Sequence, residues 1–197
     1  MKEFEKIRRY SRSAVMDEAD RSYPSYNLFL AGPFINIDLP ADHCHNNSSP
    51  SKVLRYSLYN HLTEKGHVVY LGEDAQMRIN GEANFGSYGN AVILERHHIK
   101  HHNHAVIVIP DSPGSFCEIG DWVSDKKICE FLNIIIDSKY KDEINYINEG
   151  IVKLALSNHA SIVYESYENI DAVKEICDDF IDDIDQRIRM EKLYERT

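Results

Sequence analysis

Short apolar runs alternate along the chain with longer segments whose apolar residues recur at helical spacing. Strands buried on both faces are apolar throughout, whereas a half-buried helix repeats its apolar positions every 3.6 residues. Five runs of five or six residues therefore predict β-strands. These runs span residues 26–31, 67–71, 105–109, 131–136 and 160–164.

The segments between these runs predict helices that carry the chain from one strand to the next. They span residues 50–66, 90–103, 115–130, 144–157 and 170–196. Alternating strands and helices predict an α/β fold with a doubly wound, five-stranded parallel sheet, covered on both faces and ending in a long C-terminal helix. Residues 1–22 are expected to form an N-terminal helical segment, with a single α/β domain over 23–197. Residues 72–89 predict a long binding loop.

This fold class predicts where a ligand would bind. In the flavodoxin-like strand order 2-1-3-4-5, the chain changes direction between the first and third strands, and ligands bind beyond the carboxyl ends of the strands at that point. The loops that meet there contain Ala31, Gly32, Pro33 and Phe34 after the first strand, and residues 111–118 after the third.

The second of these loops has two compatible interpretations. Ser115 and Glu118 are three residues apart, the spacing of a capping box that begins a helix. The same helix start would present backbone amides to a phosphate or carboxylate and would place the Glu118 carboxylate in the cleft. One carboxylate near an anomeric carbon and a second acidic group near the leaving group is the usual arrangement for cleaving a glycosidic bond. Asp111 and Asp121 are both candidates for that second group.

The composition of the chain argues against nucleic acid and membranes as binding partners. The chain has 197 residues, with 22 Lys and Arg against 32 Asp and Glu, and a net charge of -10. A negative surface repels a phosphate backbone, so we expect no direct nucleic-acid binding. No apolar run approaches the roughly 20 residues that cross a bilayer. The four cysteines are scattered and no signal peptide begins the sequence, so we expect a reduced, cytoplasmic protein with no membrane association.

Three segments together resemble a known family. Residues 28–34 read Leu-Phe-Leu-Ala-Gly-Pro-Phe, Glu95 lies upstream of the run Ala-Val-Ile-Val-Ile-Pro, and residues 111–120 read Asp-Ser-Pro-Gly-Ser-Phe-Cys-Glu-Ile-Gly. This pattern resembles the nucleoside deoxyribosyltransferase-like superfamily. It is closer still to the N-glycosidase effectors of bacterial retron anti-phage systems, which carry a similar turn. The resemblance covers residues 27–164, and the turn around Glu118 is its specific part.

The resemblance implies roles for individual residues. Glu118 would be the nucleophile, and the glycine-containing loop after the first strand would line a nucleotide pocket. The transferases have an aspartate where Ser112 stands, so Asp111 is the candidate acid/base if the loop shifts by one residue. Glu95 would hold the ribose hydroxyls, and amides near Gly32, Gly114 and Ser115 would hold phosphate. Relatives of the retron type act on nucleotides such as NAD and break the bond between nicotinamide and ribose.

A run of histidines precedes the third strand. His97 and His101, and likewise His98 and His102, are four residues apart on one helix face, so each pair could supply two metal ligands. Two histidines make an incomplete metal site and the sequence indicates no third ligand, so we expect no metal site. The alternative is that His98 or His102 contacts the substrate at the pocket edge, in which case activity would depend on pH near neutrality.

We therefore expect an N-glycosidase that releases the base from a nucleotide, with NAD as the leading substrate, in anti-phage defence and with no cofactor. The alternatives are a nucleoside deoxyribosyltransferase, a nucleoside monophosphate glycosidase, or a catalytically silent nucleotide-sensing domain. The expected partners are the small-molecule substrate and either a second copy of the chain or a protein of the same defence system.

Overall fold

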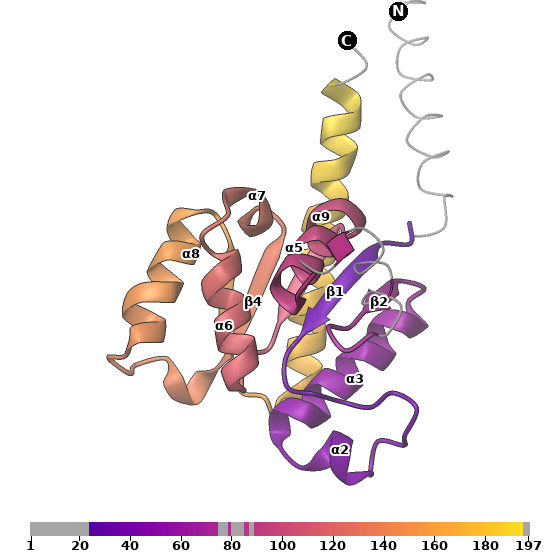
Figure 1. The fold of residues 1–197 in the computed structure, drawn as a ribbon, viewed down its shortest axis with the longest axis vertical. Coiled ribbons are helices and arrows are strands. Elements are labelled where there is room, and N and C mark those ends of the chain that lie inside the picture. Colours follow the sequence, from indigo (N-terminus) through magenta and orange to yellow (C-terminus); the bar gives the residue numbers. More distant parts are fainter. Residues whose placement is uncertain (1–23, 75–78, 80–84, 87–88, 195–197) are drawn as a thin grey trace, which may run out of the picture.

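The computed structural model describes residues 24–74, 79, 85–86 and 89–194 (Figure 1). The predicted N-terminal segment over 1–22 and most of the predicted loop over 72–89 lie outside these residues. The helices and strands among the described residues are β1 (Asn27–Ala31), α2 (Cys44–Asn47), α3 (Pro50–Glu64), β2 (Val68–Tyr70), α5 (Ala91–His102), β3 (Ala105–Val108), α6 (Pro113–Trp122), α7 (Lys126–Cys129), β4 (Leu132–Asp137), α8 (Lys153–Ser157), β5 (Ser161–Glu165) and α9 (Ile170–Tyr194), with a 3-10 turn η2 (Ser138–Tyr140) and a π-helix η3 (Ile147–Val152).

The five strands form one parallel sheet in the order β2-β1-β3-β4-β5, which confirms the predicted doubly wound fold. β1 lies between β2 and β3, with Leu30 opposite Ile107 and Ala31 opposite Val108. The carboxyl ends of β1 and β3 are therefore adjacent, and the chain leaves them in opposite directions. This is the edge of the sheet where a ligand site is expected.

Two helical layers cover the sheet. α3 and α9 pack on one face, where Leu54, Leu58 and Leu62 of α3 and Cys177 and Ile181 of α9 share one buried cluster. The other face is covered by α5, α6, α7 and α8, whose side chains make a second cluster. In Figure 1, α9 runs behind the sheet and extends beyond it at the end where the C-terminus lies. The long C-terminal helix predicted from the sequence is thus confirmed.

Two predicted helices are interrupted. The segment expected as one helix over 115–130 consists of α6 and α7, because the Asp125 side chain accepts a hydrogen bond from the backbone of Lys127 and starts a new helix. The segment expected over 144–157 begins as the π-helix η3 and becomes α-helical only at Lys153. Helical spacing of apolar residues does not distinguish one helix from two short ones in succession.

Among the described residues, no helix is both long and apolar enough to span a membrane.

Candidate active site

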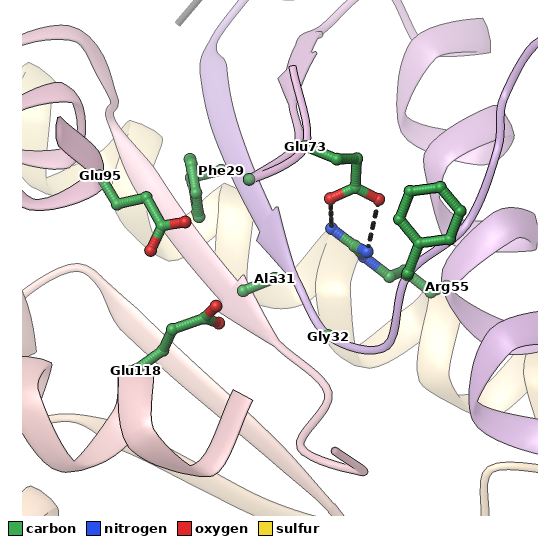
Figure 2. A pocket seen from close by; sticks show the side chains of 9 residues that line it. Phe29, Ala31, Gly32, Arg55, Glu73, Glu95 and Glu118 are labelled. Carbon is green, nitrogen blue, oxygen red and sulfur yellow. Dashed lines mark hydrogen bonds and ion pairs between the residues drawn. The ribbon is translucent and has the colours of Figure 1, made fainter. Parts of the chain in front are cut away.

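A polar pocket of about 190 Å³ lies beyond the carboxyl ends of β1 and β3 (Figure 2). Its walls come from both helical layers and from the loops after β1 and β2, so residues far apart in the sequence meet there. The lining residues are Phe29, Ala31, Gly32, Phe34, Arg55, Gly72, Glu73, Glu95 and Glu118. Five of them, Ala31, Gly32, Phe34, Glu95 and Glu118, were predicted as site residues from the sequence.

Two of the predicted carboxylates share one side of this pocket. Figure 2 shows Glu95 from α5 and Glu118 from α6 both extending toward the space above Ala31. Glu95 is almost fully buried. A Cβ atom at position 72 would lie 3.0 Å from Oε1 of Glu95, so the glycine at this position makes room for that carboxylate. The arrangement places two acidic groups in one small cavity, the combination that most enzymes use to cleave glycosidic bonds.

The start of α6 differs from the predicted capping box. The N-cap is Ser112, not Ser115, and the reciprocal hydrogen bonds join Ser112 and Ser115. The predicted pairing of Ser115 with Glu118 was therefore wrong: capping uses the serine three residues earlier, with Pro113 as the first helical residue. The Glu118 carboxylate takes no part in the cap and extends into the pocket instead.

The environment of Glu118 favours its protonated form. Burial raises the pKa of this carboxyl above its usual range, because a charged group loses hydration in the pocket. Arg55 opposes this shift and Glu73 adds to it, each through its charge. A carboxyl with a raised pKa in a cleft is typical of a functional site.

Arg55 and Glu73 form the opposite wall. Arg55 comes from α3 and is 1% exposed, and its guanidinium pairs with both carboxylate oxygens of Glu73 at 2.8 and 3.0 Å. The same guanidinium donates to the carbonyls of Leu30 at 2.7 Å and Pro33 at 2.9 Å. One side chain thereby connects α3, the end of β1 and the loop after β2.

Gly32 is required where β1 turns into the pocket. Its φ is +153°, and a Cβ atom there would lie 2.9 Å from the carbonyl oxygen of Ile109 and 3.2 Å from Cδ of Arg55. Any side chain would push this loop away from β3 or from Arg55. The glycine therefore allows the floor of the pocket to form.

Several predicted site residues lie beside the pocket rather than in its lining. Asp111 is held by a hydrogen bond from the buried Ser51 of α3. The amide of Ser115 donates to Ser112, and Gly114 lies beside it in the first turn of α6. Pro33 is buried, with its carbonyl bound to Arg55. These residues support the pocket walls in this structure.

The histidines of α5 form a cluster outside the pocket lining. His98 packs against Tyr70 and Phe29, with ring centroids 4.5 and 6.3 Å apart, so it lies behind a pocket wall. The ring of His102 is tilted against that of His98, with their centroids 5.1 Å apart, and the ring centroids of His97 and His101 are 4.6 Å apart. Burial, with smaller contributions from neighbouring histidines, lowers the pKa of His97 and of His98. The described residues contain no group of three or more side chains suited to a metal ion.

Sequence reasoning missed Phe29, Arg55, Gly72 and Glu73. A signal existed for two of them. Arg55 follows Leu54 and precedes Leu58 and Leu62 on the apolar side of its helix, where a charge needs a buried partner. Glu73 comes two residues after the apolar run that forms β2, at the same edge of the sheet as the pocket. No pattern in the sequence indicated that Arg55 and Glu73 form an ion pair.

Comparison with known proteins places the chain in a family. Residues 51–197 match the model of the STM3845 retron effector protein family. This range includes α3 from its second residue, α5, α6 and every pocket residue except those of β1 and the loop after it. The chain belongs to this retron effector family. The predicted relationship to retron effectors is thereby confirmed, while membership of the deoxyribosyltransferase-like superfamily stays a prediction.

A curated relative supports the same relationship. The chain is 33% identical over 87 residues to an Escherichia coli protein with the name "Retron Ec86 putative ribosyltransferase/DNA-binding protein". The alignment covers 44% of the chain and 27% of the relative, so the chain corresponds to little more than a quarter of that protein's length.

Proposed function

We propose that this retron effector cleaves the N-glycosidic bond of a nucleotide in anti-phage defence, with NAD as the leading substrate. The observation that carries the proposal is the pair of carboxylates, Glu95 and Glu118, in one pocket at the switch point of the sheet. The name of the Escherichia coli relative, which includes ribosyltransferase, supports chemistry at a ribose carbon.

In the proposed reaction, the ionised carboxylate of Glu118 attacks the anomeric carbon, or stabilises the positive charge that develops there. The bond between this carbon and the base nitrogen breaks, and its electron pair leaves with the base. Water then attacks the anomeric carbon and displaces Glu118, and a carboxylate of the pocket takes the water's proton. Glu95, which lies beside the same space, accepts hydrogen bonds from the ribose hydroxyls.

The charges of the pocket support NAD as substrate over an ordinary nucleoside. Nicotinamide in NAD is a cationic pyridinium and leaves as a neutral molecule, so its departure needs no proton. A purine or pyrimidine leaves with a negative charge unless an acid protonates it. Asp111, the predicted acid/base, is bound to Ser51 beside the pocket and does not belong to its lining. Three carboxylates against one guanidinium also favour a cationic base.

The test is to incubate the purified chain with NAD, nucleosides and nucleoside monophosphates and to measure free base by chromatography. We expect nicotinamide release from NAD and its loss, by roughly a thousandfold or more, in Glu118→Gln. The matched control is Glu149→Gln, which removes an exposed carboxylate from the π-helix η3. Unchanged turnover in Glu118→Gln would exclude this residue as the nucleophile. Nucleotide binding with no free base in wild type would favour the sensing alternative.

A second candidate is transfer of the ribosyl group to an acceptor other than water, which the name of the relative favours. That name also includes DNA-binding, whereas the net charge of -10 led us to expect no direct nucleic-acid contact for this chain. Adding single- or double-stranded DNA to the NAD assay tests both points. A ribosylated DNA product would replace hydrolysis by transfer and would overturn our expectation about nucleic acid.

A further inference from the structure

The ion pair between Arg55 and Glu73 places a buried guanidinium at the wall of the pocket. Burying a guanidinium is expensive, and a buried ion pair often contributes less to stability than apolar side chains of similar volume. Arg55 is 1% exposed, and its Nε atom is buried without a hydrogen-bond partner. Glu73 remains partly exposed to the pocket, with 23% of its side chain accessible. A charge kept under these conditions points to a role in the pocket.

Geometry gives the pair a fixed position relative to Glu118. Arg55 is held by the carbonyls of Leu30 and Pro33, and Glu73 also accepts a hydrogen bond from the amide of Ile35. Both ends of the pair are thus tied to the end of β1 and the loop after it. Figure 2 shows the pair on one side of the space above Ala31, with Glu118 on the other.

The charged groups that line the pocket around Glu118 come from three elements. They are Arg55 from α3, Glu73 from the loop after β2, and Glu95 from α5. Positive charge on Arg55 lowers the pKa of Glu118, and negative charge on Glu73 raises it. A nucleophilic carboxylate must be ionised to react. The two members of the pair therefore act on the reacting group in opposite directions.

We propose that the Arg55–Glu73 pair is a positioning unit for Glu118: anchored at the end of β1, it fixes one positive and one negative group on the side of the pocket opposite the Glu118 carboxylate. The catalytic significance of this unit rests on the proposed function, but its action on Glu118 does not. Arg55 and Glu73 are positioning residues: they act on the reaction through Glu118 and through the loop that they hold.

The experiment measures the ionisation of Glu118 directly. The full chain is labelled with ¹³C at glutamate carboxyl carbons and titrated by NMR, and the signal missing from Glu118→Gln identifies the residue. We expect Glu73→Gln to move the titration midpoint of Glu118 to lower pH and Arg55→Met to move it to higher pH. Arg55→Lys keeps the charge but loses the paired geometry, so its midpoint should lie between wild type and Arg55→Met. Glu149→Gln should leave the midpoint unchanged.

The proposal is supported if the titration midpoint of Glu118 moves in opposite directions in Glu73→Gln and Arg55→Met. A merely structural role would move the midpoint in the same direction in both variants, or in neither. Equal or absent displacements overturn it. If Arg55→Met does not fold, Glu73→Gln decides: a midpoint that is unchanged or raised overturns the proposal. In the pH–rate profile for base release from NAD, the low-pH midpoint should shift among the folded variants in the same order as the NMR titration midpoint of Glu118. Opposite NMR displacements in a protein that releases no base would uphold the control of Glu118 and refute the proposed function.

Discussion

Helix α5 carries two sets of ionisable side chains with different surroundings. Glu95, in its first half, is buried in the pocket, next to Gly72 and on the same side as Glu118. The histidines that follow within two turns pack on one another and on Tyr70 and Phe29, outside the pocket lining. In the sequence, the histidine run is the more conspicuous feature.

The difference shows that position relative to the sheet edge, rather than the local density of reactive residues, decides which side chains reach the pocket. α5 leads into β3, so its end lies at the amino end of that strand, whereas ligands bind at the carboxyl ends. Each turn of α5 toward its C-terminus is therefore a step away from the pocket. Glu95 is early enough in the helix to reach the pocket and the later histidines are not.

The variant that would most sharply break this comparison is Glu95→Gln. We expect base release from NAD to fall by about tenfold to a hundredfold, because hydrogen bonds from ribose hydroxyls to a carboxylate contribute roughly 1.5 to 3 kcal/mol. Steady-state kinetics with NAD measure the loss. The matched control on the same helix is His101→Gln, which should retain wild-type rates. Equal loss in both variants would remove the distinction between the two parts of α5.

We expect Glu118→Gln to be more stable than wild type as well as inactive. Because burial raises the folded-state pKa of Glu118 above its unfolded value, the ionised form costs stability at neutral pH. Replacing it removes that cost, so we expect thermal unfolding at a higher temperature at pH 7. The gain should shrink as the pH falls through the raised folded-state pKa and should vanish below the ordinary range of a glutamate, where the carboxyl is protonated in both states. A variant less stable than wild type at pH 7 would contradict this account of the pocket.

Asp111→Asn should have a smaller effect, on stability more than on chemistry. Asp111 accepts a hydrogen bond from Ser51 and so connects α3 with the start of α6. We expect a loss of about 1 kcal/mol in unfolding free energy, measured by urea denaturation, and a change in base release of only a few fold. Loss of activity with unchanged stability would restore Asp111 as the acid/base.

The smallest effect is expected from the histidines. The double variant His97→Gln/His101→Gln removes one of the two histidine pairs of α5, and wild-type base release should persist with and without EDTA. Inhibition by EDTA, or loss of activity in the double variant, would show that the cluster binds a metal or reaches the substrate.

The sequence by itself determined the sheet and where its site lies. Continuous apolar runs separated by helical segments define a parallel sheet, and the handedness of crossovers leaves few possible strand orders. Residues that directly follow β1 and β3 could therefore be assigned to the pocket before the structure was known. Gly32 and Phe34 directly follow β1, Ala31 ends it, and Glu118 lies in α6, the helix after β3. Glu95 was predicted from the family resemblance, and all five residues line the pocket.

Only the tertiary structure decided which polar groups meet. Ser112 and Ser115 both suit a cap, and the choice between them depends on how the loop leaves β3, so the local pattern assigned the wrong serine. Arg55 and Glu73 are 18 residues apart, and their pairing follows from the packing of α3 under β1 and β2. Local periodicity reports which face of an element is buried, whereas a polar contact across elements depends on ångström-scale placement that no local pattern encodes.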